Sequence, residues 1–299
     1  MAKWNVVNLS TLENFKDFSS EYYKKEFLCY SNLIRRIGVV RAITVSFITD
    51  GEHGSPCWSS DSGINYITAE YIKENYILNG EYKQISLEQD RRNSRARLQN
   101  GDILIYSVGA YAGYAAVAEP HLFPANIPRS VAIIRLKKDC GLLPEYVSAF
   151  LNSKYGSFQT FRLRAGNSQP VLALDKIRQL EIPLLDQEQQ NVIKDIYNLA
   201  YKKRMESRLS YKKAVSLLEN KLHLNDLSLT KTKTFIAQFS DVIHSQRIDS
   251  GHYRNEFKVM FNFISNSFEC KTIGDLTYIN KRGLQPTYTD NGGNNGYQQ

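Results

Sequence analysis

The sequence lacks the features that mark membrane, secreted and disulfide-stabilised proteins. No run of about 18 apolar residues occurs, so we expect no membrane span. The first residues do not join a basic start to an apolar stretch, so we expect no secretory signal. The cysteines form no C-x-x-C pair, which argues against a zinc cluster or a disulfide framework; they are Cys29, Cys57, Cys140 and Cys270. These absences favour a protein of the reducing cytoplasm.

The motifs of nucleotide-driven and metal-driven catalysis are missing as well. There is no G-x-x-x-x-G-K-[ST] phosphate loop, no G-x-G-x-x-G fingerprint, no H-E-x-x-H motif and no adenine-methyltransferase signature. A nuclease-type set can be drawn from Asp61, Glu81 and Lys83. Such spacings arise readily by chance when 23% of residues are charged. We therefore predict a chain without catalytic residues, metal ligands or a cofactor of its own.

Length and charge point to a folded protein with a polyanionic partner. The 299 residues leave room for about two domains, and a hydrophobic content of 42% is ordinary for a globular chain. Lys and Arg number 38 against 30 Asp and Glu, which gives a formal charge of +8. A moderate basic excess attracts phosphate and favours nucleic acid as the partner.

Residues 1–183 are predicted to form a β-rich α+β domain. Short stretches rich in β-branched residues lie between turn residues and predict strands, namely RAITVSFI (41–48), GDILIYSV (101–108) and SVAIIRL (130–136). Two helical insertions are expected, at 144–158 and 174–180.

Residues 184–225 are predicted to be one long spacer helix. From 186 to 224 there is no Gly or Pro, and helix formers dominate. About 36 residues at a rise of about 1.5 Å give a rod of roughly 54 Å. Its spaced apolar residues favour packing against a partner helix; they are Val192, Ile196, Leu199, Val215, Leu218 and Leu222. The basic stretch 201–213 is read as a solvated face, with a DNA backbone or an acidic partner as the alternative.

Beyond this helix the sequence begins to repeat itself. YYKKEF (22–27) returns as HYRNEF (252–257), and RRIGVV (35–40) has a counterpart in KTIGDL (271–276). We therefore expect residues 226–299 to be the incomplete start of a second, similar domain, ending in a Gly/Asn-rich loop.

Three polar segments are candidate DNA-binding loops. Arginine forks suit phosphates and guanine edges, and Asn and Gln pair with adenine. The turn 49–56, the arginine-rich segment 91–97 and the polar loop 161–170 carry these residue types. The predicted DNA-binding residues are His53, Ser55, Arg91, Arg92, Arg95, Arg97, Arg162, Arg164, Asn167 and Gln169. Ordinary connecting loops remain the alternative for each segment.

Five stretches follow one another in a characteristic order. They are DGEHGSP (50–56), GDILIYSVGAYAG (101–113), PEYVSAFLNSKYG (144–156), GNSQPVLALDKIRQLEIPL (166–184) and EQQNVI (188–193). In this order and near these spacings the chain resembles the specificity subunits of type I restriction-modification systems, with RIDSGHYRNEF (247–257) resembling the entry to a second recognition domain. It departs from that pattern in lacking a second proline near Leu184 and the remainder of the second domain.

This resemblance implies a subunit that binds one half of a bipartite sequence in double-stranded DNA. Methyltransferase subunits would dock on the helices, and a motor-nuclease subunit would join them; S-adenosylmethionine, ATP and Mg²⁺ are expected on these partners. A homodimer through the long helices is a further possibility. Two alternatives stay open: a helix-mediated assembly module that reads no sequence, and the recognition subunit of a combined cutting-and-methylating enzyme.

Overall fold

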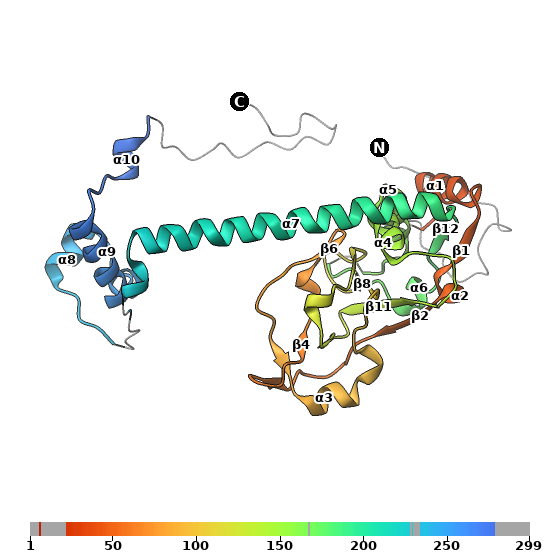
Figure 1. The fold of residues 1–299 in the computed structure, drawn as a ribbon, viewed down its shortest axis with the longest axis horizontal. Coiled ribbons are helices and arrows are strands. Elements are labelled where there is room, and N and C mark those ends of the chain that lie inside the picture. The colour runs from red at the N-terminus through yellow and green to blue at the C-terminus, as the bar shows by residue number, and fades with distance from the viewer. Residues whose placement is uncertain (1–5, 7–21, 167, 228, 230–233, 279–299) are drawn as a thin grey trace. The chain divides into compact units, whose positions relative to one another are not determined.

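The computed structural model describes residue 6 and residues 22–166, 168–227, 229 and 234–278 (Figure 1). Contacts within the chain divide it into two units, Met1–Glu206 and Ser207–Gln299. The division falls inside the long helix α7 (Gln187–Lys221), so this helix contributes to both units. The domain limits expected at residues 183 and 225 therefore stay a prediction.

A four-stranded antiparallel sheet lies at the centre of the first unit, in the order β2-β11-β8-β9. Its strands are β2 (Ser46–Asp50), β8 (Ile103–Tyr106), β9 (Ala115–Val117) and β11 (Val131–Leu136). Ile103 and Ile105 enter one buried cluster, while Leu104 and Ile133 enter another. Because successive strand residues point to opposite faces, both faces of the sheet are covered. This explains why β8 and β11 read as continuous apolar runs, and the strands predicted there are confirmed.

Three smaller sheets surround the central one. Strand β1 (Val39–Arg41) pairs with β12 (Glu181–Pro183), and β5 (Ile72–Lys73) pairs with β6 (Tyr76–Ile77). A second four-stranded sheet has the order β10-β4-β7-β3. Its strands are β3 (Trp58–Ser59), β4 (Asn65–Tyr66), β7 (Gln84–Ile85) and β10 (Ala125–Asn126).

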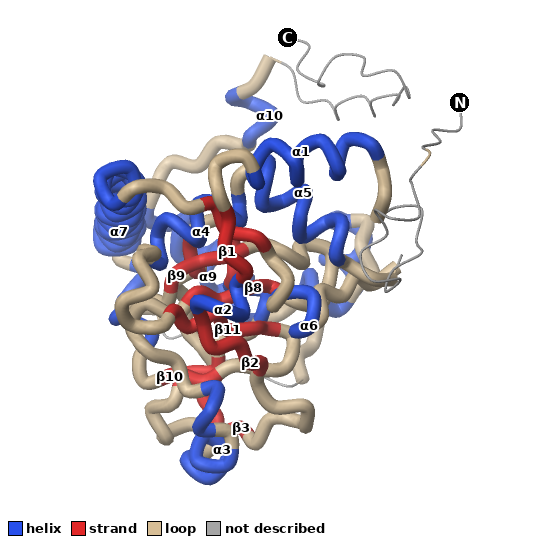
Figure 2. Tube along the Cα trace, turned by 90° about the vertical axis from the view of Figure 1, so that its right-hand side faces the viewer, coloured by secondary structure: helices blue, strands red, loops and turns tan. Residues whose placement is uncertain are grey.

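Helices cover two opposite sides of these strands. The α-helices of the first unit are α1 (Lys25–Arg35), α2 (Ala42–Val45), α3 (Leu87–Arg92), α4 (Pro144–Asn152), α5 (Lys154–Leu163) and α6 (Leu174–Ile177). Its 3-10 turns are η3 (Ala69–Tyr71), η4 (Ser94–Ala96) and η5 (Pro120–Leu122). In both views α3 lies across the central strands from α1, α4 and α5 (Figures 1 and 2).

The single strand predicted at 41–48 is wrong. A helical turn, α2, separates β1 from β2, with the Thr44 and Ser46 hydroxyls donating to the carbonyls of Arg41 and Ala42. The backbone N–H of Ala42 donates to Leu180 O at 2.8 Å. The turn carries the chain from the β1–β12 pair into the central sheet. It depends on contacts with residues far along the sequence, which β propensity does not register.

The single helix predicted at 144–158 is two helices, and the one at 174–180 is a single short turn, α6. Ser153 ends α4 in an extended conformation and caps α5, because its hydroxyl accepts from Gly156 N. A side chain at Gly156 would come within 2.2 Å of Phe150 O, so glycine permits the close approach of the two helices.

The prediction of a long helix after the α+β domain is confirmed by α7. Its start is capped by Asp186, whose carboxylate accepts from Gln189 N at 2.8 Å. None of the described helices is long and apolar enough to cross a membrane.

The described part of the second unit is helical and contains no strand. It holds η6 (Leu224–Asp226), α8 (Phe239–Ser245), η7 (Ser250–Tyr253), α9 (Asn255–Ser267) and α10 (Ile273–Leu276). The repeated motif begins a helix at the same position in both copies, since Lys24 and Arg254 have nearly identical φ and ψ before α1 and α9. The second match diverges, because β1 is a strand and α10 is a capped helical turn.

Candidate nucleic-acid interface

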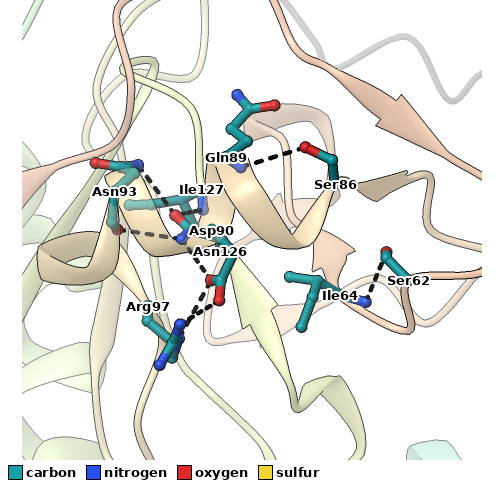
Figure 3. Close-up of polar contacts among 9 residues, drawn as sticks. All are labelled: Ser62, Ile64, Ser86, Gln89, Asp90, Asn93, Arg97, Asn126 and Ile127. Carbon is teal, nitrogen blue, oxygen red and sulfur yellow. Dashed lines mark hydrogen bonds and ion pairs between the residues drawn. The ribbon is translucent and has the colours of Figure 1, made fainter.

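A buried polar network fixes α3 to the edge of the smaller four-stranded sheet. Asn126 lies on β10, and its amide donates to the Asp90 carboxylate at 2.9 Å. Asn93 in turn donates to the Asn126 carbonyl oxygen at 3.1 Å. All three side chains are buried and partnered (Figure 3). Since a buried polar group left unpaired is destabilising, this network holds α3 in one orientation.

The arginine-rich segment 91–97 therefore projects from a rigid base. Arg97 donates from Nε and one Nη to the two carboxylate oxygens of Asp90, in a bidentate pair (Figure 3). The hydrogen bond and charge of Asp90 raise the pKa of Arg97 above its ordinary value. Arg91 is exposed and has no side-chain partner among the described residues, and Arg92 lies 3.9 Å from the Glu88 carboxylate. All four arginines of the segment are exposed, although Arg97 is held by Asp90.

The turn 49–56 and the residue that follows it contact the basic segment and α3. Arg95 pairs with Asp50 at 3.3 Å, and the same carboxylate pairs with His53 at 2.9 Å. Gln89, on α3, accepts from Cys57 N at 2.6 Å and donates to the Glu52 carboxylate. Two segments that the sequence predicts separately thus form one surface. His53 and Ser55 lie exposed on it.

The third predicted segment reaches the same end of the central sheet. The turn 127–130 is linked to the first loop, because Arg129 N donates to Glu52 O at 3.0 Å. Ser107 continues the chain of contacts: its hydroxyl donates to Arg129 O, and its carbonyl accepts from Leu172 N. Gly109 N donates to Pro170 O at 2.9 Å. Segments 50–57, 107–113 and 127–130, together with residues 165–166 and 168–171, therefore form a row, which we call the loop rim.

Only part of the third predicted set is exposed on the loop rim. Gln169 is exposed there, and Asn167 lies outside the described residues. Arg162 is half-buried and donates to Tyr22 O at 2.7 Å and to the Ser31 hydroxyl at 3.2 Å. Arg164 lies over the Phe161 ring at 4.5 Å, and burial lowers its pKa. The contacts of Arg162 belong to the packing of α1 and α5, away from the other candidates.

The sequence reasoning missed Arg129. Its side chain is exposed on the loop rim and has no partner among the described residues. A lone arginine in a Pro-Arg-Ser turn carries no signal in the sequence. It gains significance only because β2, β8 and β11 bring their connecting loops to one end of the sheet.

The first part of α7 contacts the domain through residues other than the predicted apolar stripe. Gln190 is buried, with its amide donating to Gly141 O and its carbonyl accepting from Leu143 N. The Tyr197 hydroxyl accepts from Val117 N at 3.2 Å. Val192, Ile196 and Leu199 remain 55–63% exposed. Farther along, Val215 and Leu218 are exposed, and Leu222 lies just past the last residue of the helix.

A cavity of about 280 Å³ lies between α7 and the domain, beside Tyr76, Tyr197 and Glu119. Arg204 lies 3.4 Å from the centre of the Tyr76 ring. Burial raises the pKa of Glu119 to about 7, and the charge of Arg204 opposes this shift. Glu119 and Arg204 of α7 thus line the same cavity.

The described residues contain no group of three or more His, Cys, Asp or Glu side chains arranged to hold a metal ion. In the alternative nuclease set, the Asp61 carboxylate accepts from the Ser59 hydroxyl at 2.9 Å, and Lys83 lies over an indole ring. The arrangement offers hydrogen-bonding groups and positive charge on loops that are held by backbone contacts.

No protein-family profile and no curated protein matches the chain. In structure it is similar to specificity subunits of type I restriction-modification systems. One is the S subunit from M. genitalium, at 15% identity and a TM-score of 0.42, over 62% of this chain and 44% of that one. Another is the HsdS subunit from Thermoanaerobacter tengcongensis, at 17% identity and 0.39, over 64% and 46%. The type IIG restriction endonuclease BpuSI gives 9% and 0.45, over 85% and 34%. The chain spans less than half the length of each.

Proposed function

We propose that this chain is a non-catalytic DNA-recognition subunit of a type I restriction-modification system and reads one half of a bipartite target. The observation that carries the proposal is the loop rim joined to α3. Asp50 pairs with Arg95 of the arginine-rich segment, and Glu52 accepts from Gln89 of α3. Arg129 connects that turn to Ser107, and Gly109 donates to Pro170. Rigidly held cations and amides on adjacent loops suit phosphate contacts and base-edge contacts.

Within this surface the side chains divide into two roles. Arg91, Arg95 and Arg129 are exposed forks that can contact phosphate or the O6 and N7 atoms of guanine. Gln169 and His53 offer hydrogen bonds to base edges. Arg97 is held in a bidentate pair and acts mainly to fix η4 against α3. Each good bidentate base contact discriminates by about 1–3 kcal/mol.

The exposed stripe on α7 is the docking surface for protein partners in this proposal. Val192, Ile196 and Leu199 stay uncovered although the opposite side of the helix packs on the domain. Methyltransferase subunits or a second copy of this chain would cover them, and a motor-nuclease subunit would join the assembly. S-adenosylmethionine, ATP and Mg²⁺ would bind to those partners.

Selection from a random duplex pool tests this proposal. The chain, assembled with the methyltransferase subunit of its own system, is incubated with 30-base-pair duplexes of random sequence, and bound duplexes are sequenced over several rounds. We expect one motif to be enriched, and Arg95→Ala with Arg129→Ala to weaken the enrichment. A soluble complex that enriches no motif would refute sequence reading and leave the helix-mediated assembly module as the better account.

A further inference from the structure

Trp58 is a large aromatic side chain held half in solvent. It lies on β3, where its backbone pairs with Ile85 of β7. The edge of its indole ring meets Tyr66 at 5.7 Å between ring centres, and Tyr66 is itself buried. The Trp58 side chain is nevertheless 51% exposed. The sheet and Tyr66 thus hold the ring in place while about half of the residue stays exposed.

Two cations lie near this ring. The ammonium of Lys83 lies over the indole, 5.1 Å from its centre, and Lys83 is exposed. Arg92 reaches within 4.0 Å of the sulfur of Cys57, the residue preceding Trp58. Cys57 also contacts α3 through Gln89. Trp58 therefore continues the surface formed by the turn 49–56 and the arginine-rich segment.

An exposed aromatic ring with cations nearby favours one kind of binding partner over another. An aromatic ring packs well against the face of a nucleobase or against deoxyribose. A lysine over the ring and an arginine beside the preceding residue can bind the phosphates that flank such a unit. An apolar protein surface would gain from the ring but would bury Lys83 and Arg92 in an apolar contact. The two nearby cations therefore favour DNA.

We propose that Trp58 contacts the DNA directly, with its indole against a base or deoxyribose and with Lys83 and Arg92 on the adjacent phosphates. This inference rests on the proposed function and extends the binding surface from the loop rim to the edge of β3. The proposed contact of Trp58 does not depend on hydrogen bonds to base edges.

Fluorine NMR reports on this contact directly. The chain contains two tryptophans, Trp4 and Trp58, so Trp4→Phe leaves Trp58 as the single site for 5-fluorotryptophan. The labelled chain is assembled with unlabelled methyltransferase subunit and titrated with the duplex enriched by selection. We expect the single resonance to shift and to lose its sensitivity to solvent on binding. Binding with an unchanged resonance would overturn the contact and leave the proposed function intact, whereas absence of binding would overturn both.

Affinity measurements distinguish the contribution of the Trp58 ring to binding from that of the nearby charge. Trp58→Ala is expected to weaken duplex binding about 10-fold, while Trp58→Phe recovers most of that loss. Lys83→Ala is expected to reduce the salt dependence of binding by about one unit of slope, and Trp58→Ala to leave the slope unchanged. Tyr155→Ala is the matched control, because Tyr155 is also a partly exposed ring edge-on to a tyrosine, on α5. Equal affinities for Trp58→Ala and Tyr155→Ala would refute the inference.

Discussion

The sequence marks Arg162 and not Arg129 as a DNA-binding residue, but their surroundings in the structure favour the reverse. Arg162 donates from α5 to Tyr22 O at 2.7 Å and to the Ser31 hydroxyl at 3.2 Å. Its guanidinium also lies 3.7 Å from the centre of the Tyr22 ring. It therefore joins α5 to α1 and to the segment before it. Arg129 is exposed and makes no such contact among the described residues.

Arg162→Ala should therefore lower the free energy of unfolding without a specific effect on DNA recognition. Hydrogen bonds from a charged donor contribute about 1.5–3 kcal/mol and a partly desolvated cation–π contact about 0.5–2 kcal/mol, and these contributions overlap. We expect a loss of about 2–4 kcal/mol. Arg162→Lys keeps the charge but not the fork, and should lose less.

Urea unfolding followed by circular dichroism measures this loss, provided that the slope of the free energy against urea is unchanged. Arg129→Ala serves as the matched control and should stay within about 0.5 kcal/mol of the unsubstituted chain. If Arg162→Ala unfolds at the same urea concentration as the unsubstituted chain, its packing role is refuted. A specific loss of duplex affinity in a fully stable Arg162→Ala chain would return this residue to the DNA-binding set.

Arg129→Ala should weaken binding to the selected duplex about 10-fold in a fluorescence-anisotropy titration, and unchanged affinity would remove it from the interface. Phe27 is 3% exposed between Phe158 and Phe161, whereas its repeat counterpart Phe257 is 46% exposed. Phe27→Ala should thus lose about 3–5 kcal/mol in urea unfolding and Phe257→Ala less than about 1 kcal/mol; equal losses would contradict the burial difference. Because burial raises the pKa of Glu119 to about 7, the folded chain binds this proton more tightly than the unfolded chain. Stability should fall as pH rises from about 5 to about 8, and Glu119→Gln should remove about 1–3 kcal/mol of that fall; an identical pH profile in the variant would exclude it.

Local sequence patterns were sufficient to predict the elements that have continuous apolar runs or long stretches of helix-forming residues. Strands β8 and β11 follow from apolar runs that are buried on both faces, and α7 follows from a long stretch without Gly or Pro. The turn α2 could not be predicted in the same way. Its backbone N–H groups bond to Arg178 and Leu180, which lie far away in the sequence.

The sequence predicted which residue types form the candidate site but did not predict where they lie in the fold. His53, Arg91 and Arg95 are exposed, and their role in DNA binding stays a prediction. Asp50, an acidic residue outside the predicted set, pairs with both His53 and Arg95. Arg162 shows the reverse case. Its basic, polar neighbourhood in the sequence resembles a binding loop, yet its partners come from α1 and the segment before it.

We propose that this chain selects the DNA sequence on which its partners act. The most direct measurement co-expresses it with the methyltransferase subunit of its system in a host without adenine methylation, and maps methylated adenines by long-read sequencing. The account predicts methylation within one bipartite motif, with Arg95→Ala and Arg129→Ala relaxing or abolishing that motif in complexes that still assemble. Methylation without sequence preference from a soluble complex, or a motif that neither substitution alters, would contradict it.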